Sequence, residues 1–209
     1  MKILLINTCG VEGVAALANI HGVAAIERLP GRGSSEMLVP AVRRLLAGSE
    51  VAELDAVGVV FGPGSFTGVR VGLSAAKGIC EAGAVRMVAM SRLALVAGDD
   101  GIALLDAGRG EFYCGVYAGG RVVTEQLLGA DMVTSLLQGR TPLTCEPRVV
   151  ELAKARLDIK VTLVAEPGAE EMLAMVRRRI TASEWSDVAT VDANYMRRTD
   201  AELLAGAKR

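Results

Sequence analysis

The chain has 209 residues, a length that suits one medium domain or two small ones. Its formal net charge is −1, which argues against a protein that binds nucleic acid on its own, because such domains are usually basic. Hydrophobic residues make up 51% of the chain and aromatic residues only 3%, so we expect a sizeable core of alanine, valine and leucine.

The sequence offers neither a membrane segment nor a disulfide framework. No uncharged apolar run approaches the ~18 residues that a membrane span needs, and the N-terminal residues enter a strand instead of a cleavable signal. The cysteines are scattered without C-x-x-C spacing, at Cys9, Cys80, Cys114 and Cys145. This pattern is typical of buried thiols in a reducing compartment, so we expect a cytoplasmic protein.

The N-terminal part of the chain predicts a meander of strands followed by a helix. Apolar stretches separated by turns predict strands at residues 2–6, 14–17 and 23–27. The first strand runs into Asn7, whose side chain we expect to bond within the turn itself. Ser34 or Ser35 is placed to cap a helix that runs to about Leu46.

A turn of proline and glycine follows the next predicted strand, an apolar run at residues 57–61. The turn reads Gly62-Pro63-Gly64-Ser65-Phe66-Thr67-Gly68. Ser65 or Thr67 can cap the helix that begins there, and the N–H groups at a helix N-terminus can hold an anion. The P-loop order is absent, because Lys77 lies about ten residues, or roughly 15 Å, beyond the turn. The spacing leaves open an anion site or a tight turn whose glycines allow close contact with a neighbour.

The helix after this turn has an apolar arc about twice the ~100° that one core face needs. Its polar side chains gather on one face, at Arg70, Ser74, Lys77 and Glu81. Small residues recur at every fourth position, at Gly68, Gly72, Ala76 and Cys80. Such a stripe lets a second helix approach closely, so we expect one side on the sheet and the other on a second protein. Gly72→Leu should then block pairing but leave the chain folded; burial of both sides within the chain is the alternative.

A polar linker at residues 98–101 separates two apolar runs and leads into the second half. Before it we expect a strand at 86–89 and a helix at 92–97 capped by Ser91. After it we expect strands from residue 102, at 111–117, 122–127, 143–145 and 161–164, and helices at 132–138, 149–155 and 170–180. Asp106 and Glu111 could act as paired acid and base, but an ion pair with Arg109 is the favoured interpretation. For Arg177 to Arg179 a solvated helix end is favoured over contact with RNA phosphate.

The stretch from Gly62 to Gly78 resembles the signature of the TsaB (YeaZ) family, Gly-x-Gly-Ser-Phe-Thr-Gly-(Leu/Val)-Arg-(Ile/Val)-Gly followed by Ala-Lys-Gly. Residues 106–113 and 193–197 are similar to two further family segments, and Asn7 stands where the family usually has aspartate. The resemblance implies an α/β fold of two ribonuclease-H-like domains of the actin, sugar kinase and Hsp70 superfamily (ASKHA), the second reduced. These would span residues 1–98 and 101–198, with a last helix at about 199–209 packing back on the first.

The same resemblance implies a non-catalytic scaffold subunit for threonylcarbamoyladenosine modification of tRNA, at the adenosine next to the anticodon. The chain would bind and activate a TsaD-like catalytic subunit, work with a TsaE-like ATPase, meet tRNA only through the complex and form a homodimer when isolated. It would bind no cofactor by itself, whereas the complex uses ATP. The helices at 34–46 and 66–82 would form the joint. The expected interface residues are Gly64, Ser65, Phe66, Thr67, Gly68, Arg70, Val71, Gly72, Ala75, Ala76, Gly78 and Ile79.

Two enzymatic alternatives belong to other functional classes. A nucleotide-dependent kinase or ATPase of the same superfamily is the main one, although Asn7 lacks a carboxylate charge and the P-loop lysine is missing. A peptide hydrolase needs a nucleophile and a base, but the single histidine, His21, lies in a strand turn with nothing in the chain order to pair it with a serine. One histidine also excludes the two-histidine metal motif of the family's catalytic relative.

Overall fold

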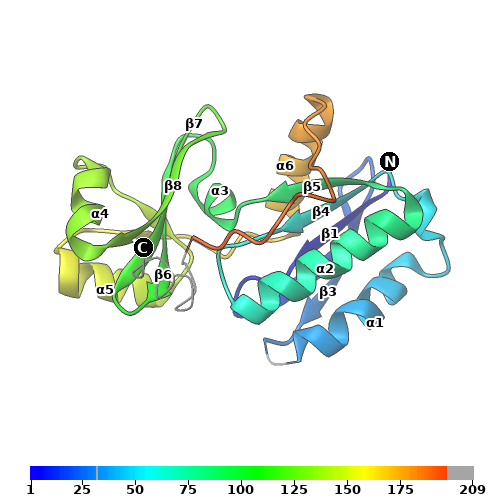
Figure 1. Cartoon of the computed structure of the whole chain (residues 1–209), viewed down its shortest axis with the longest axis horizontal. Coiled ribbons are helices and arrows are strands. Elements are labelled where there is room, and N and C mark those ends of the chain that lie inside the picture. The colour runs from blue at the N-terminus through cyan, green and yellow to red at the C-terminus, as the bar shows by residue number, and fades with distance from the viewer. Residues whose placement is uncertain (32, 197–209) are drawn as a thin grey trace, which may run out of the picture.

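A computed structural model of the protein describes residues 1–31 and 33–196. Two five-stranded sheets lie side by side in this part of the chain (Figure 1). The first contains β1 (Ile3–Asn7), β2 (Gly13–Ala18), β3 (Val23–Leu29), β4 (Ala56–Val60) and β5 (Arg86–Met90). The second contains β6 (Ile102–Gly108), β7 (Glu111–Ala118), β8 (Arg121–Gly129), β9 (Leu143–Thr144) and β10 (Thr162–Leu163). The last helix expected at 199–209 and the end of the 193–197 segment lie outside the described residues.

The two sheets have the same topology. The first is ordered β3-β2-β1-β4-β5, with β1–β2 and β2–β3 antiparallel and β1–β4 and β4–β5 parallel. The second repeats this order as β8-β7-β6-β9-β10, with the same strand directions. Strands β9 and β10 contain only two residues each. The expected pair of ribonuclease-H-like units, the second reduced, is therefore confirmed.

The last helix of each unit packs on the sheet of the other unit, whereas the remaining helices pack on the sheet of their own unit. Helices α1 (Ser34–Leu46) and α2 (Phe66–Gly83) pack on the first sheet, while α4 (Ala130–Leu137) and α5 (Pro147–Leu157) pack on the second. A short 3-10 helix, η1 (Val51–Glu53), precedes β4. Helix α3 (Arg92–Ala97) follows β5 but packs on β6, β7 and β9. Helix α6 (Ala169–Thr181) follows β10 but packs across the first sheet (Figure 1). The units expected at 1–98 and 101–198 thus exchange their last helices.

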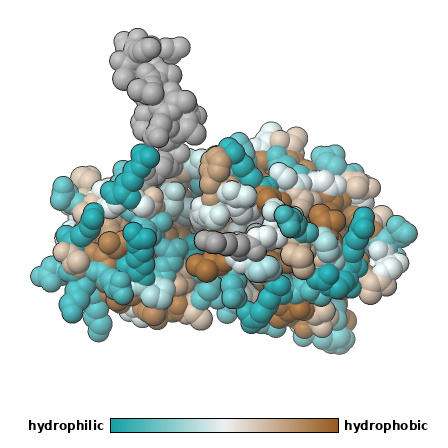
Figure 2. All heavy atoms as spheres, turned by 90° about the horizontal axis from the view of Figure 1, so that it is seen from below, coloured by the Kyte–Doolittle hydropathy of each residue, from teal (hydrophilic) through white to brown (hydrophobic). Residues whose placement is uncertain are grey.

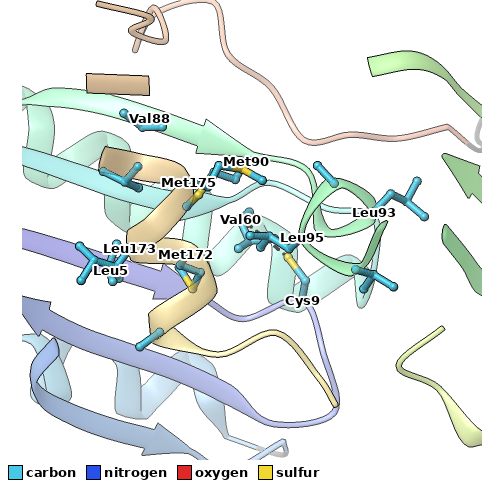
Figure 3. Close-up of a cluster of buried hydrophobic side chains, with 14 of the residues drawn as sticks. Leu5, Cys9, Val60, Val88, Met90, Leu93, Leu95, Met172, Leu173 and Met175 are labelled. Carbon is cyan, nitrogen blue, oxygen red and sulfur yellow. Dashed lines mark hydrogen bonds between the residues drawn. The ribbon is translucent and has the colours of Figure 1, made fainter. Parts of the chain in front are cut away.

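Strand β1 is apolar from Ile3 to Ile6, as expected of a strand that is covered on both faces. Ile3 and Leu5 belong to a core that α6 completes with Met172 and Leu173. Leu5 lies beside α6 in Figure 3. Alternate residues such as Leu4 point to the opposite core, beneath α1 and α2. A third core joins α4 and α5 to the second sheet.

The helix starts test the capping predictions. Ser65 caps α2, since its Oγ accepts a hydrogen bond from the Gly68 N–H at 3.3 Å, which confirms that choice over Thr67. Helix α1 begins at Ser34 after Gly33, whose φ of 89° needs glycine and which supplies no side-chain cap. The expected serine cap there was wrong. Ser91 precedes α3 as expected, but without a side-chain bond to its first turn.

Within the described residues, the helices are too short or too polar to span a membrane. The face of the molecule in Figure 2 shows hydrophobic residues scattered among hydrophilic ones, with no broad apolar band.

Candidate functional site

Helix α2 rests on β1 through its small residues. A Cβ on Gly68 would collide with the Thr8 carbonyl oxygen, and one on Gly72 would collide with the Thr8 hydroxyl. Thr8 Oγ1 donates to the Gly68 carbonyl at 2.5 Å, and Ala76 is fully buried on the same face. Gly68, Gly72 and Ala76 therefore serve contact within the chain, so placing them in an interface with a second protein was wrong. Gly72→Leu would damage the fold itself, contrary to the expectation above.

The remaining expected interface residues of α2 lie toward solvent. Thr67, Arg70 and Gly78 are exposed, whereas Val71, Ala75 and Ile79 are half-buried. A Cβ on Gly78 would meet no atom within 4 Å, so this part of the helix is open to close approach. Helix α1 flanks α2 on the sheet, and the Lys77 Nζ donates to the Ala189 carbonyl at 3.4 Å in the segment after α6. The chain thus covers only part of the wide apolar arc of α2. The part left toward solvent is called the outward face of α2 and comprises Thr67, Arg70, Val71, Ala75, Gly78 and Ile79.

Two aromatic rings and a guanidinium form a cluster at the N-terminal end of this outward face. Phe66 is 51% exposed and Tyr195 is 41% exposed, and their ring centroids lie 5.4 Å apart. The Arg70 guanidinium carbon lies 3.7 Å from the Phe66 centroid, a cation–π distance. The Arg70 Nε also donates to the Tyr195 hydroxyl at 2.6 Å. Side chains of these types are enriched where proteins bind each other.

Tyr195 reaches the cluster because residues 185–196 run as a strap from α6 toward the second sheet (Figure 1). Ser186 forms a β-bridge with Met87, and its Oγ accepts from the Ala89 N–H at 2.9 Å. Asn194 donates from its backbone to the Phe61 carbonyl at 2.8 Å and from its side chain to Glu125 at 2.7 Å. Tyr195 was missing from the expected interface, although residues 193–197 had shown a family-like segment.

The cleft between the two units is a cavity of about 500 Å³. It lies where the β1–β2 loop and the turn before α2 face the second unit. Its lining includes Gly10, Gly64, Ser65, Arg92, Asp106, Tyr113 and Glu146. Asn7 Oδ1 accepts from the Cys9 N–H at 3.0 Å, which confirms the expected bond within the turn. Gly64 and Ser65 thus face both the cleft and the start of α2.

Arg92 joins the two units beneath this cleft. Its side chain is 3% exposed and forms ion pairs with Glu146 at 2.8 Å and Glu166 at 2.6 Å. Burial alone would lower the pKa of the guanidinium, but the hydrogen bond and charge of Glu166, with Glu146, raise it. Glu146 also accepts from the Asp106 N–H at 2.7 Å. The charge of Arg92 is matched by carboxylates, so it offers little attraction to a phosphate. This pairing could not be predicted from the sequence, because the two glutamates lie more than fifty positions from Arg92.

The other residues that the sequence suggested as functional are held by contacts within the chain or lie apart from the cleft. Asp106 pairs with the Arg148 Nε at 3.1 Å, and His21 lies exposed in the β2–β3 turn. The three consecutive arginines contact different groups: Arg177 the Asn19 carbonyl, Arg178 the Asp99 carboxylate and Arg179 the Ala89 carbonyl. They are not a simple solvated helix end. Among residues 1–31 and 33–196, no group of histidine, cysteine and acidic side chains could hold a metal ion.

Known proteins are similar to this chain in sequence. The profile of the family described as "TsaD: tRNA N6-adenosine threonylcarbamoyltransferase" matches residues 26–189. The chain is 32% identical over 127 residues to the tRNA threonylcarbamoyladenosine biosynthesis protein TsaB of Escherichia coli (strain K12), covering 56% of this chain. This alignment spans 55% of the length of that relative. An uncharacterized protein of Mycobacterium tuberculosis (strain ATCC 25618 / H37Rv) is 30% identical over 213 residues, covering 97% of this chain and 95% of its own.

The fold is similar as well. YeaZ from Pseudomonas aeruginosa superposes with a TM-score of 0.75 at 25% sequence identity. The superposition covers 93% of this chain and 99% of that chain. The likeness therefore extends over both sheets and the helices exchanged between them.

Proposed function

This chain belongs to the TsaB (YeaZ) family, and we propose that it acts as a non-catalytic subunit in the synthesis of threonylcarbamoyladenosine on tRNA. The E. coli relative is named as a biosynthesis protein for this nucleoside, and the matching family profile is that of the transferase. In this proposal the outward face of α2 binds a TsaD-like catalytic subunit. A TsaE-like ATPase joins the complex, and tRNA is met only through it.

The outward face of α2 carries this proposal. It combines the exposed Phe66–Arg70–Tyr195 cluster with small side chains along the helix, and Gly78 leaves room there for a partner backbone. Exposed aromatic and arginine side chains dominate the binding energy of many interfaces. Small residues allow two helices to approach closely, and the steric reason does not depend on the surrounding solvent.

The interior of the cleft supports a non-catalytic role. Arg92, the cation at its base, is paired with Glu146 and Glu166. Asn7, buried at the end of β1 behind the residues that line the cleft, presents an amide that is already bonded to the turn, whereas a carboxylate there could have held a cation or acted as a base. The charged side chains that line the cleft, Arg92, Asp106 and Glu146, are all held in ion pairs, so a transferred group would find little here to activate it. We propose that chemistry takes place on the partner.

The test measures threonylcarbamoyl transfer to tRNA by the TsaD-like protein of the same cell, with and without this chain. We expect transfer only when both are present; transfer by the isolated chain would overturn the non-catalytic role. Binding is measured by calorimetry with wild type, Gly78→Arg and Val123→Arg. Gly78→Arg should weaken binding, because no atom of the chain surrounds that position. Val123→Arg places the same side chain at an exposed site on β8 and should leave binding unchanged.

A nucleotide-dependent enzyme of the same superfamily is the second candidate. The observation that favours it is the cleft of about 500 Å³ beside Gly64 and Ser65, at the start of a helix. Calorimetry of the isolated chain with ATP decides between the two. Tight binding that is lost when Ser65 is replaced by a bulky residue would favour this candidate, and absence of binding would remove it.

A further inference from the structure

A second cavity, of about 620 Å³, lies between α3, α6 and the β7–β8 hairpin. Ser91 and Arg92 are neighbours in the chain, yet Ser91 lines this cavity and Arg92 lines the cleft. The apolar lining of this second cavity includes Phe61, Ala94, Val122, Met175 and Val191. Its polar lining includes Tyr117, Arg121, Glu125, Arg178, Arg179 and Glu184. The cavity thus combines an apolar wall with several charged groups.

Two of these charged groups, Arg178 and Glu125, already have an ion pair or strong hydrogen bonds. Arg178 pairs with Asp99. Both oxygens of Glu125 are used, one accepting from the Tyr117 hydroxyl and the other from the Asn194 side chain. These contacts occupy Arg178 and Glu125. The charged residues of the lining that remain are Arg121, Arg179 and Glu184.

Arg179 differs from the others because its partner is neutral. The half-buried guanidinium donates from Nη1 to the Ala89 carbonyl at 2.8 Å and forms no ion pair with any residue the structure describes. Burial lowers its pKa, and the nearby charge of Glu184 only partly offsets this. Cations removed from water are normally paired with an anion, because desolvating an unmatched charge is costly. Arg121, exposed on the hairpin, adds a second positive charge at the edge of the cavity.

We propose that this cavity binds a small organic anion. Its carboxylate or phosphate group meets the planar guanidinium of Arg179, which can donate two parallel hydrogen bonds to such an oxyanion. Its uncharged part lies on the apolar wall formed by Phe61, Val122 and Met175. Glu184, exposed at the rim, opposes the ligand charge. This site is independent of the outward face of α2 and of the function proposed for it.

The test uses the full chain at constant ionic strength. Calorimetry and thermal unfolding are measured with inorganic phosphate, benzoate and phenyl phosphate. We expect benzoate or phenyl phosphate to raise the unfolding temperature more than inorganic phosphate does, because the ring adds contact with the apolar wall. A stronger effect of one of the two aromatic probes identifies the oxyanion. Absence of any rise, or equal rises with all three probes, would overturn the proposal.

Three variants separate the site from general effects of charge. Arg179→Gln should weaken binding about tenfold or more, because it removes a charged hydrogen-bond donor. Arg177→Gln is the matched control on the same helix; its guanidinium bonds the Asn19 carbonyl instead, so binding should be unchanged. Glu184→Gln should tighten binding, since it removes an opposing charge, and the side chain it replaces is exposed. If Arg179→Gln fails to fold, unchanged affinity in Glu184→Gln is enough to refute the site.

Discussion

Thr8 and Gly72 lie so close together that the fold has no room for a side chain at position 72. The Thr8 hydroxyl that fills this space is buried and bonded to the Gly68 carbonyl at 2.5 Å, so it has little freedom to move aside. The pair shows which side of α2 the sheet occupies. It also separates the glycines of this helix into those that support the fold and the one that faces solvent.

Gly72→Ala and Gly78→Ala should therefore change stability in opposite directions. Gly72→Ala forces a methyl group onto the Thr8 hydroxyl and should lower the free energy of unfolding by about 1–3 kcal/mol. Gly78→Ala meets nothing within 4 Å and should raise it by about 0.5–1 kcal/mol, because alanine favours helix. Urea unfolding of both variants measures this, and a shift of the same sign in both would contradict the packing described.

Tyr195 should contribute to partner binding mainly through its ring. Tyr195→Phe keeps the ring beside Phe66 but loses the bond to the Arg70 Nε, so it should weaken binding by about 0.5–1.5 kcal/mol. Tyr195→Ala removes the ring as well and should weaken binding further. Calorimetry with the TsaD-like protein gives both values. Equal losses in the two variants would mean that the hydroxyl, and not the ring, matters.

Arg92→Met should destabilise the protein by about 3 kcal/mol, because it leaves Glu146 and Glu166 without their shared cation. Denaturant unfolding measures the loss. The double variant that also carries Glu166→Gln should recover part of the stability, since one of the two unpaired charges is gone. No recovery would show that Arg92 acts by packing alone.

Stability should fall in acid through Glu166. Burial raises the pKa of this carboxyl, but the hydrogen bond and charge of Arg92 outweigh burial and lower it below the usual 4.5. Because the folded pKa is the lower one, this stabilisation is complete above about pH 4.5 and is lost as the pH falls through the folded value. Between about pH 6 and pH 3, Glu166→Gln should lose less stability than wild type in urea titrations. Parallel pH curves would exclude this source of acid sensitivity.

The cysteines should be unreactive in the folded protein. Burial raises the pKa of Cys9, Cys114 and Cys145 to about 12 and that of Cys80 to about 11. At about pH 8 the thiols are therefore protonated as well as inaccessible, and the thiolate is the reactive form. A colorimetric thiol reagent should label the native chain slowly and all four cysteines in guanidinium. Rapid labelling of the native chain would show local opening.

The predictions about α2 illustrate how far the sequence leads. Its start at the glycine turn follows from local chemistry, and residue types alone narrowed its cap to Ser65 or Thr67; the structure then selects Ser65. The face of α2 that meets the sheet could not be deduced, because the residues on both sides of the helix are small and apolar. Only the position of Thr8 on the adjacent strand end decides that Gly68 and Gly72 face inward.

Contacts between distant segments were also beyond the sequence. In the sequence, Arg92 is an ordinary residue of a predicted helix. Its partners Glu146 and Glu166 come beside it only when the second unit folds. Tyr195 belonged to a family-like segment, but its place beside Arg70 depends on the path of the strap. Hydrophobic periodicity predicts elements, and these partners are fixed only when the elements pack.

The exchange of α3 and α6 has a consequence for how the molecule behaves as a whole. Each sheet is completed by a helix that the other half of the sequence encodes, so cutting the chain at residues 98–101 would leave both halves with a bare apolar face. We therefore expect that neither half folds as an independent domain. Loss of one sheet removes the cover of the other, which favours melting of the entire chain in a single cooperative transition.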